Sequence, residues 1–371
     1  MKRIALDMRF HTASGASNYI GNMVARLVQA GSGYTFLVMR FEDQRSPNGV
    51  NVDSIICPRF GLVRQVLWDQ TRLPGVLARH GVSLYHPLKF LGALRNSCPQ
   101  VAVAHSITTP FRGEFPTSRK HELYWNVLGN RLYRSSAHVI AVSDYVREFL
   151  LEGLGIPTER ITVVHNGRDE RFRRIDDPPR PANLNESFDR PYVLAVGNMF
   201  PVKNHVTTVR AFARVASRFP DHVLVMAGGM QHAYFAKVRH AVEESGVASR
   251  IRLLGFVDAE ALLYLYNRAD ALVMPSLTEG CPITLVEAMA CGLPVVGSRR
   301  GGIAEVGGDA IRLIDDPMDV HGFAAGIADI IADRTMRAQM AEATQARVVD
   351  FTWPRAVQKT LAVYDRVLGG E

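Results

Sequence analysis

Short apolar runs alternate with longer amphipathic segments along the first half of the chain. The short runs are rich in Val and Ile, which favours β-strands, and the longer segments repeat apolar residues at helical spacing. Strands are expected at the runs RIAL, YTFLVM, SLYH, QVAVAH, AHVIAVS and ITVVHNG, and helices over residues 18–29, 122–133 and 144–154. Strands separated by helices are typical of a parallel α/β sheet. The pattern therefore predicts a Rossmann-like N-terminal domain over residues 1–178.

A proline-rich stretch, DDPPRPANLNESFDR, interrupts this alternation at residues 176–190. It has no apolar period, which is the composition of a linker, and we place the linker at residues 179–190. The alternation then restarts, with helices expected over residues 204–218, 234–245, 259–267 and 320–332, and one through Glu287. A second Rossmann-like domain is predicted over residues 191–355. The last helix, within residues 356–371, is expected to pack back toward the N-terminal domain.

The predicted fold class is therefore α/β, with two Rossmann-like domains and an interdomain cleft. In such sheets ligands gather at the carboxyl ends of the strands, and a cleft between two domains is a natural place for one. The 371 residues suffice for two domains of ordinary size, and 47% hydrophobic and 21% charged residues are typical of a folded protein.

An excess of basic residues, 43 against 36 acidic ones, gives a formal net charge of +7. This balance indicates an anionic partner, namely nucleic acid, a membrane surface or a phosphate-bearing small molecule. No RNA-binding, helix-turn-helix or zinc-finger signature is present, so nucleic acid is the least favoured. The four cysteines are scattered without metal-ligand spacing, which favours core thiols, a reducing compartment and no metal site. Without a signal peptide or a long apolar run, a cytoplasmic location is expected.

Two glutamates stand eight residues apart in PSLTEGCPITLVEAMACGLPVV. The run ALVMPS is expected to be a strand and Pro282 the first residue of the next helix, which leaves Glu279 in the loop at the strand's carboxyl end. Glu287 then lies about one and a half turns, or roughly 7–8 Å, along the helix. Ionised carboxylates only accept hydrogen bonds, so this pair suits hydroxyls at two ends of one polyol ligand. The alternative is an N-terminal helix charge together with a surface or paired glutamate.

Lys203 and His105 follow other expected strands. In VGNMFPVKNH, Lys203 and the N–H groups at the start of a helix suit a phosphate, although a cation there opposes the helix dipole unless an anion is near. His105 ends QVAVAH, where an imidazole can donate to a sugar hydroxyl or move a proton, but a lone histidine is as often structural. Gly15, in TASGASNY, is weaker support for a ligand near the backbone, because the segment is not GxGxxG.

Together these segments resemble the family 4 glycosyltransferases, a retaining group with the two-domain GT-B fold. The second half carries the resemblance in VGNMFPVKN, in residues 251–298 with their E-x7-E motif, in EVGGDAIRL and in FTWPRAVQKTLAVY. The first half carries it in residues 4–27, WDQTRLPGVL, AVSDYVREFL and VVHNGRDERF. The similarity spans nearly the whole chain, and it is greatest toward members that transfer mannose during bacterial surface polysaccharide assembly.

The resemblance implies a role for each candidate. Glu279 matches the residue that holds the donor sugar, Glu287 the one that holds the ribose, and Lys203 the one that grips the diphosphate. His105 matches the residue beside the outer sugar hydroxyl, and Glu279, His105 and Lys203 are the expected catalytic residues. Many relatives have Arg where this chain has Asn198, so the phosphate site departs from the family there. The expected donor-binding residues are Gly15, Asn198, Lys203, Phe256, Val257, Glu279, Gly280, Cys281, Pro282, Ile283 and Glu287.

The activity implied by the resemblance is a retaining hexosyl transfer without metal or cofactor. Mannose from GDP-mannose is the first candidate donor, and the acceptor is a glycan or a polyprenyl-diphosphate-linked oligosaccharide. A UDP-sugar-dependent transferase of the same fold, a nucleotide-sugar epimerase and an inactive nucleotide-sugar-binding subunit stay open as alternatives. A nicotinamide oxidoreductase is disfavoured, because no GxGxxG is followed by an acidic residue at the required spacing.

A basic and aromatic group in the first half fits peripheral contact with the inner face of an anionic membrane. A solvated helix with a packed aromatic residue explains it equally well. The residues of this group are Arg112, Arg119, Lys120, Tyr124, Trp125, Arg131 and Arg134.

Overall fold

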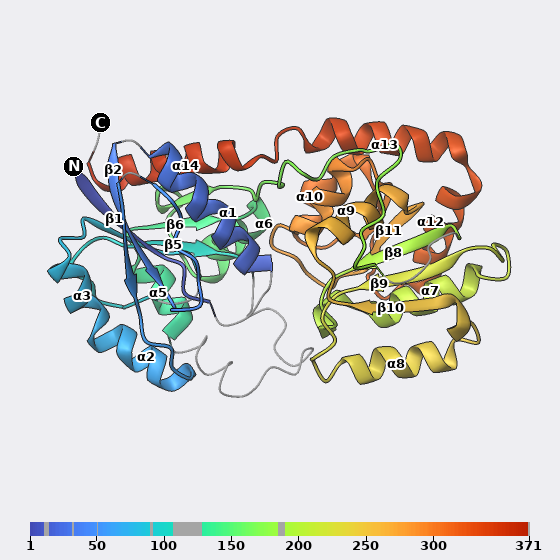
Figure 1. Cartoon of the computed structure of the whole chain (residues 1–371), viewed down its shortest axis with the longest axis horizontal. Coiled ribbons are helices and arrows are strands. Elements are labelled where there is room, and N and C mark those ends of the chain that lie inside the picture. Colours follow the sequence, from blue (N-terminus) through green and yellow to red (C-terminus); the bar gives the residue numbers. More distant parts are fainter. Residues whose placement is uncertain are drawn as a thin grey trace. The chain divides into compact units, whose positions relative to one another are not determined.

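The computed structural model describes residues 1–10, 15–31, 33–49, 51–89, 92–106, 128–184 and 190–369 (Figure 1). The chain divides into two compact units, one of Met1–Gly167 with Thr352–Glu371 and the other of Arg168–Phe351. The chain passes between them at residues 167–168 and 351–352, whereas the linker expected at 179–190 falls in the range of the second unit.

The first unit contains two parallel sheets, of order β3-β2-β1-β4 and β5-β6-β7. An isolated parallel bridge between Tyr85 and Gln100 joins their facing edges. Strands β4, β5 and β6 are buried along their whole length, as expected for parallel strands covered on both faces. The strands are β1 (Lys2–Asp7), β2 (Tyr34–Arg40), β3 (Val52–Ile56), β4 (Leu84–Pro87), β5 (Val101–Ala104), β6 (His138–Ala141) and β7 (Ile161–Val163).

The helices of the first unit follow the expected pattern in part. The helix expected over 144–154 is α6 (Asp144–Glu148), which continues as a π-helical turn over Phe149–Gly153. The helix expected over 122–133 begins outside the described residues, and α5 (Asn130–Ser135) covers its end. The remaining helices are α1 (Gly15–Ala30), α2 (Leu62–Thr71), α3 (Leu73–Arg79) and α14 (Trp353–Val367).

The last helix, α14, belongs to the first unit and packs against α1. It begins at Trp353, three residues before the expected start, because the Thr352 hydroxyl caps the Arg355 N–H and a proline stands in the first turn. Its buried residues recur at helical spacing and form one apolar stripe. These residues are Trp353, Ala356, Val357, Thr360, Val363 and Tyr364.

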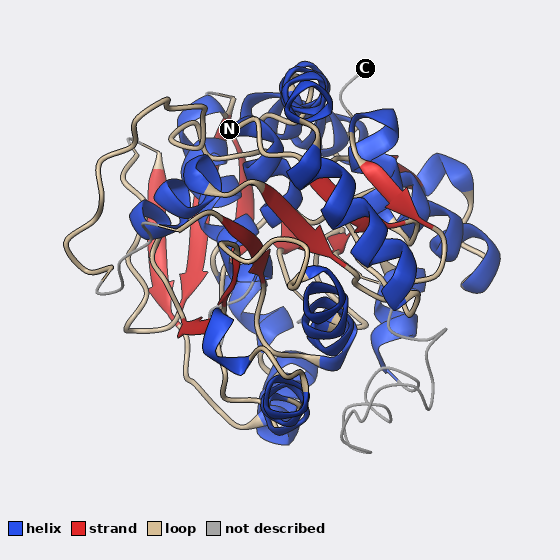
Figure 2. Cartoon of the chain, turned by 90° about the vertical axis from the view of Figure 1, so that its right-hand side faces the viewer, coloured by secondary structure: helices blue, strands red, loops and turns tan. Residues whose placement is uncertain are grey.

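The second unit is built on one parallel sheet of order β10-β9-β8-β11-β12-β13. Helices cover both faces of this sheet (Figure 2). Strand β8 lies beside β9 on one side and β11 on the other, so the strand order reverses between β8 and β11. The strands are β8 (Tyr192–Val196), β9 (Val223–Ala227), β10 (Ile251–Gly255), β11 (Ala271–Met274), β12 (Val295–Ser298) and β13 (Arg312–Ile314).

The helices of the second unit include one that the sequence pattern did not predict, α13 (Arg334–Val348). Its apolar stripe is narrow, with Ala341, Thr344 and Val348 buried, which explains why the periodicity was weak. The Asp333 side chain caps it by accepting from the N–H groups of Thr335 and Met336. The other helices are α7 (His205–Val215), α8 (Phe235–Glu244), α9 (Ala259–Arg268), α10 (Ile283–Ala290), α11 (Gly302–Gly307) and α12 (Val320–Ala332).

Two further features bear on the expectations from sequence. None of the four cysteines forms a disulfide, and three of them, Cys57, Cys281 and Cys291, are buried. Within the part of the chain that the structure describes, no helix combines the length and apolarity needed to span a bilayer.

Candidate active site

The candidate site in the second unit lies where its strand order reverses. Lys203 ends a 3-10 turn (Pro201–Lys203) after β8, and Glu279 stands in the loop after β11, the neighbouring strand. The Leu277 N–H donates to the Val202 carbonyl at 2.8 Å and ties the two loops together. In open α/β sheets this switch point, at the carboxyl ends of the strands, is where ligands bind.

Lys203 and Glu279 form an ion pair with Nζ and Oε1 2.5 Å apart. Lys203 precedes α7, where a cation opposes the helix dipole. Glu279 is the nearby anion that offsets this unfavourable position. The two side chains are 20% and 14% exposed. The pair is therefore sheltered but remains open to a ligand.

The loops after β8 and β9 approach one another too closely for side chains. A Cβ on Gly228, at φ +152°, would lie 2.0 Å from the Gly197 carbonyl oxygen, so only glycine fits there. The Asn198 side-chain oxygen accepts from the Gly229 N–H at 2.9 Å, and the Met199 N–H donates to the Gly229 carbonyl. Asn198 therefore braces these two loops, in addition to its predicted role toward the donor.

The loop from Gly280 to Ile283 is held by the start of α11. The Gly302 N–H donates to the Glu279 carbonyl at 2.8 Å, and a Cβ on Gly302 would lie 1.9 Å from the Gly280 carbonyl oxygen. Helix α10 begins at Ile283, one position after the expected start, and Pro282 is its N-cap with extended backbone. A missing N–H costs nothing at the cap either, so the local chemistry is unchanged.

Glu287 lies on α10 with only 3% of its surface exposed, so the interpretation of a surface residue is wrong. The Tyr266 hydroxyl donates to its Oε2 at 3.4 Å. Burial raises the Glu287 pKa to about 8 and Asp169 adds to this, while Tyr266 and Arg171 lower it. Near neutral pH the carboxyl group is therefore mostly protonated, and the expectation of an acceptor-only group applies once it ionises.

Phe256 and Val257 follow β10 on the same edge of the sheet. The Phe256 ring is 72% exposed, an unusual position for a large apolar side chain. The Gly228 N–H donates to the Gly255 carbonyl at 2.8 Å and holds the end of β10 beside that of β9. The exposed Phe256 ring therefore lies at the same edge of the sheet as the loops after β8 and β9, which Asn198 joins.

His105 belongs to the first unit, directly after β5. Its Nε2 lies 2.7 Å from the Leu88 carbonyl oxygen, and burial lowers its pKa to about 4. A carbonyl only accepts, so in the neutral ring Nε2 carries the proton and Nδ1 the lone pair. The ring is therefore neutral and held through Nε2, and its contact with a sugar hydroxyl stays a prediction.

Gly15 is the first residue of α1, and the residues before it, 11–14, lie outside the described part of the chain. One turn further along α1, the buried Tyr19 ring packs edge-on against His105, with centroids 4.6 Å apart. The start of α1 and His105 are therefore brought together within the first unit. Lys203, Glu279 and Glu287 are all in the second unit.

The basic and aromatic group expected to contact a membrane is described only in part. Arg112, Arg119, Lys120, Tyr124 and Trp125 lie outside the described residues. Arg131 and Arg134 lie on α5, and Arg134 Nε donates to the Leu154 carbonyl at 2.9 Å. This arginine is thus engaged in the fold of the first unit.

Comparison with known proteins covers both units. The model for glycosyl transferases group 1 matches residues 178–347, and the model for glycosyltransferase family 4 matches residues 13–172. The chain belongs to the family 4 glycosyltransferases.

Curated relatives of this glycosyltransferase differ in what they act on. It is 26% identical to D-inositol 3-phosphate glycosyltransferase 2 of Catenulispora acidiphila, over 90% of the chain and 74% of the relative. It is 29% identical to a GDP-mannose-dependent alpha-(1-6)-phosphatidylinositol monomannoside mannosyltransferase of Mycolicibacterium smegmatis, over 62% of the chain and 64% of the relative. It is 28% identical to the Escherichia coli O-antigen chain mannosyltransferase B, over 62% and 61%. The chain thus spans less than two thirds of either mannosyltransferase.

Solved structures share the fold of this glycosyltransferase over its full length. Sucrose-phosphate synthase from Thermosynechococcus elongatus superposes with a TM-score of 0.81 at 20% identity, covering all of both chains. Anabaena Alr3699/HepE in complex with UDP and glucose gives a TM-score of 0.76 at 19% identity, covering 99% of this chain and all of that one. These likenesses establish the GT-B fold predicted from the sequence.

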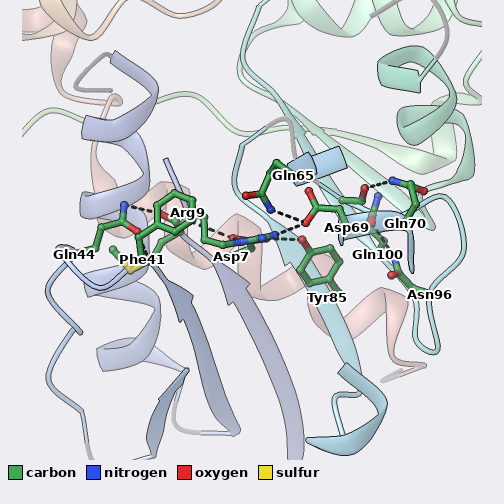
Figure 3. A network of polar contacts seen from close by, with 12 residues as sticks. Asp7, Arg9, Phe41, Gln44, Gln65, Asp69, Gln70, Tyr85, Asn96 and Gln100 are labelled. Atoms are coloured by element: carbon green, nitrogen blue, oxygen red, sulfur yellow. Dashed lines mark hydrogen bonds and ion pairs between the residues drawn. The ribbon is translucent and has the colours of Figure 1, made fainter. Parts of the chain in front are cut away.

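The glycosyltransferase also holds a polar cluster that the sequence pattern did not predict, in its first unit (Figure 3). Arg9 donates to both oxygens of Asp7, at 2.8 and 2.5 Å, and to Asp69 at 3.0 Å. Tyr85 donates to Asp7 at 2.6 Å and Gln65 to Asp69 at 3.2 Å. All five side chains are 2% exposed or less, and we call them the arginine cluster. The available signal was that Asp7 ends a strand and Arg9 lies two residues beyond it.

Proposed function

We propose that this glycosyltransferase moves a hexose, with mannose from GDP-mannose as the first candidate, to a glycan or polyprenyl-diphosphate-linked acceptor in cell-surface polysaccharide biosynthesis. The observation that carries the proposal is the Lys203–Glu279 pair at the switch point of the second unit's sheet. In this proposal residues 191–355 bind the donor and residues 1–178 the acceptor.

Lys203 is proposed to act on the leaving group. As the bond between the anomeric carbon and the diphosphate breaks, negative charge grows on the phosphate oxygens. The ammonium group of Lys203 neutralises that charge, and in doing so it releases the carboxylate of Glu279. Preorganised charge of this kind supplies a large part of the rate enhancement in group transfer.

Glu279 and the backbone of Gly280–Ile283 are proposed to hold the donor sugar. The freed carboxylate accepts from sugar hydroxyls. The acceptor hydroxyl attacks the anomeric carbon on the face from which the diphosphate leaves and passes its proton to the departing diphosphate oxygen, so configuration is retained. His105 is proposed to lie beside an outer hydroxyl of the donor sugar. Glu287 holds the ribose, and ribose hydroxyls that donate to its carboxylate favour the ionised form.

The donor and acceptor are supported by the relatives. One of them is named as GDP-mannose-dependent and another as an O-antigen chain mannosyltransferase, which favours a mannosyl donor and a surface glycan. The inositol phosphate named for another relative makes a phosphorylated polyol the second candidate acceptor. The fold neighbour bound to UDP and glucose keeps UDP-sugars as the second candidate donor class.

Calorimetric binding of GDP, UDP and ADP, then of GDP-mannose and UDP-glucose, tests the donor assignment. We expect tight binding of guanine nucleotides by the wild type and a loss of at least tenfold in Glu287→Ala. Binding of UDP alone would move the donor to the UDP-sugars. If no nucleotide binds, the chain is an inactive subunit and the proposal fails.

Turnover tests the catalytic assignment. GDP release from GDP-mannose is measured with a polyprenyl-diphosphate-linked glycan and with inositol 3-phosphate as acceptors. Lys203→Ala is expected to lower kcat about 100-fold or more, because the leaving group loses its cation. Lys237→Ala, which removes an exposed lysine from α8 of the same unit, is the matched control and should leave kcat unchanged. Full activity of Lys203→Ala would reject the assignment, and free epimerised nucleotide sugar would indicate an epimerase.

A further inference from the structure

His205 is a buried histidine whose ring is engaged on one side only. It is the first residue of α7 and is 3% exposed. Its Nε2 lies 3.1 Å from the Gly197 carbonyl oxygen, whereas its Nδ1 has no hydrogen-bond partner among the described residues. Burial lowers its pKa to about 4, so the ring is neutral, and Nε2 carries the proton because a carbonyl only accepts. Burying Nδ1 without a partner costs free energy that an apolar side chain would not, so the bond to Gly197 is the feature to explain.

The peptide group between Gly197 and Asn198 is held by its surroundings. A Cβ on Gly228 would lie 2.0 Å from the Gly197 oxygen and 2.3 Å from its carbonyl carbon, so the Gly228 backbone packs directly against this peptide group. Gly197 itself has φ +150°, and a glycine has many other conformations open to it. The direction of the Gly197 carbonyl is therefore fixed by its contacts, and His205 is its hydrogen-bond donor.

The direction of the Gly197 carbonyl determines where the Asn198 N–H points. The peptide bonds of the described segments are trans, and in a trans peptide group the C=O and the N–H point in opposite directions. The buried His205 ring lies on the carbonyl side, so the Asn198 N–H points away from it. No residue in the described part of the chain accepts from this N–H, whereas the next one, of Met199, donates to Gly229.

The unpaired Asn198 N–H belongs to the loop over which the Lys203 side chain passes. The Cδ and Cε atoms of Lys203 would lie 3.3 Å from a Cβ on Gly197, so the lysine stem packs against this glycine. The Asn198 side-chain oxygen already accepts from Gly229. A backbone N–H without a protein partner is satisfied by water or by a ligand, and phosphate oxygens accept readily from backbone N–H groups. The Lys203 ammonium and the Asn198 N–H therefore suit two oxygens of one diphosphate.

We propose that the Asn198 backbone N–H donates to the diphosphate of the donor, and that His205 positions this N–H through the Gly197 carbonyl. The inference rests on the proposed function and adds one contact to the same leaving group. As negative charge grows on the phosphate, a fixed N–H dipole stabilises it together with Lys203. Without the bond from His205 the glycine peptide can turn, and the N–H loses its direction. His205 itself touches no substrate, so it is a positioning residue.

Two variants of His205 separate positioning from packing. His205→Leu fills the space without a donor, whereas His205→Gln returns an N–H near the position of Nε2. We expect kcat for transfer from GDP-mannose to fall about tenfold or more in His205→Leu and to recover to within about threefold of wild type in His205→Gln. Guanosine, which has no phosphate, should bind to both variants as it does to the wild type. His222→Leu, which removes a partly buried histidine just before β9, is the matched control and should keep kcat.

The Asn198 amide signal gives a second measurement that does not depend on the stability of His205→Leu. The full chain is labelled with ¹⁵N-asparagine, and the signal is assigned by its loss in Asn198→Gln. Addition of GDP or of inorganic pyrophosphate should move the Asn198 amide proton downfield in the wild type and in His205→Gln, but not in His205→Leu, because a charge-assisted hydrogen bond forms only where the N–H is positioned. An unmoved signal in the wild type with GDP bound, or equal kcat of His205→Leu and wild type, overturns the proposal.

The outcome is separable from that of the proposed function, because pyrophosphate carries neither base nor sugar. GDP binding without a shift of the Asn198 amide would reject the positioning by His205 and leave the transferase function intact. A shift with pyrophosphate but no binding of any nucleotide would reject the transferase function and keep the Asn198 N–H as a diphosphate contact. No response to either ligand would reject both.

Discussion

Both units place a cation among carboxylates at the carboxyl edge of a parallel sheet, but they differ in access to water. Arg9 lies between Asp7 and Asp69 with all three side chains 2% exposed or less, whereas Lys203 and Glu279 are 20% and 14% exposed. The side-chain types suit this difference. A guanidinium satisfies several acceptors at once in a closed site, and an ammonium is a single charge that can change partners. The sealed cluster maintains the structure, and the open pair is available to a ligand.

This difference in exposure distinguishes a structural charged cluster from a ligand site without use of the family resemblance. A charged cluster that is sealed on all sides stabilises one conformation, since breaking it strands a buried charge. An ion pair with part of its surface in water contributes little to stability and can be exchanged for a ligand contact. Stability and binding measurements on matched variants therefore separate the two regions.

The largest effect is expected from Arg9→Met. This change leaves Asp7 and Asp69 buried without their cation and should lower the free energy of unfolding by about 3–5 kcal/mol. Lys203→Met is the matched change in the open pair and should cost about 1 kcal/mol or less. Urea unfolding of both variants at neutral pH measures the difference. Equal losses of unfolding free energy in Arg9→Met and Lys203→Met would mean that exposure to water does not distinguish the arginine cluster from the Lys203–Glu279 pair.

The second-largest effect is expected from the Glu287 carboxyl group. It is buried like the Asp69 carboxylate, but no cation lies as close to it as Arg9 lies to Asp69. Its folded pKa of about 8 lies above the unfolded value of 4.5, so the folded state holds the proton more tightly. The resulting stabilisation is complete at low pH and is lost as the pH rises through this window. Between pH 5 and pH 7.5 the loss should reach about 3 kcal/mol, at about 1.4 kcal/mol per pKa unit.

Glu287→Gln isolates this contribution, because it keeps the shape and removes the titration. Histidines with lowered pKa, such as His86 at about 3 and His105 at about 4, titrate in both proteins and cancel in the difference. We expect the wild type to lose stability relative to the variant as the pH rises, measured by urea unfolding at each pH. If the free energy of unfolding changes with pH in the same way for the wild type and for Glu287→Gln, Glu287 is ionised in the folded state.

The sequence was sufficient for those parts of the fold and site that depend on local pattern. Alternating apolar runs predicted the parallel sheets, and positions after strands indicated Lys203, Glu279 and His105. The polar helix α13 was missed because only a narrow stripe of it is buried. The Glu287 position was predicted, but its protonation was not, because burial depends on the packing around α10 and Tyr266.

The arginine cluster and the direction of α2 were beyond sequence reasoning for a different reason. Arg9 and Asp69 are 60 residues apart, and no local period joins them. The rule that apolar residues face inward would orient α2 with Leu67 buried, opposite to what the structure shows. A polar pair on the inner face of a helix becomes favourable only when a buried partner exists, and here that partner is Arg9, just after β1.

The smallest effect is the most specific to the open pair. Lys203 is paired with Glu279, so under the proposed function a diphosphate displaces the carboxylate from the ammonium. Glu279→Gln removes the competing charge and should tighten GDP binding about three- to tenfold, in line with roughly 1 kcal/mol for a partly exposed ion pair. Transfer from GDP-mannose should fall at the same time, because the sugar loses its acceptor.

Calorimetry of GDP, which lacks the sugar, separates these two consequences. Lys203→Met with Glu279→Gln is the control, since without the ammonium the glutamine should give no gain in GDP affinity. Tighter GDP binding together with lower kcat would show that Glu279 occupies the phosphate's cation until the donor arrives. Weaker GDP binding by Glu279→Gln would contradict this, and would mean that the carboxylate positions Lys203 for the diphosphate rather than competing with it.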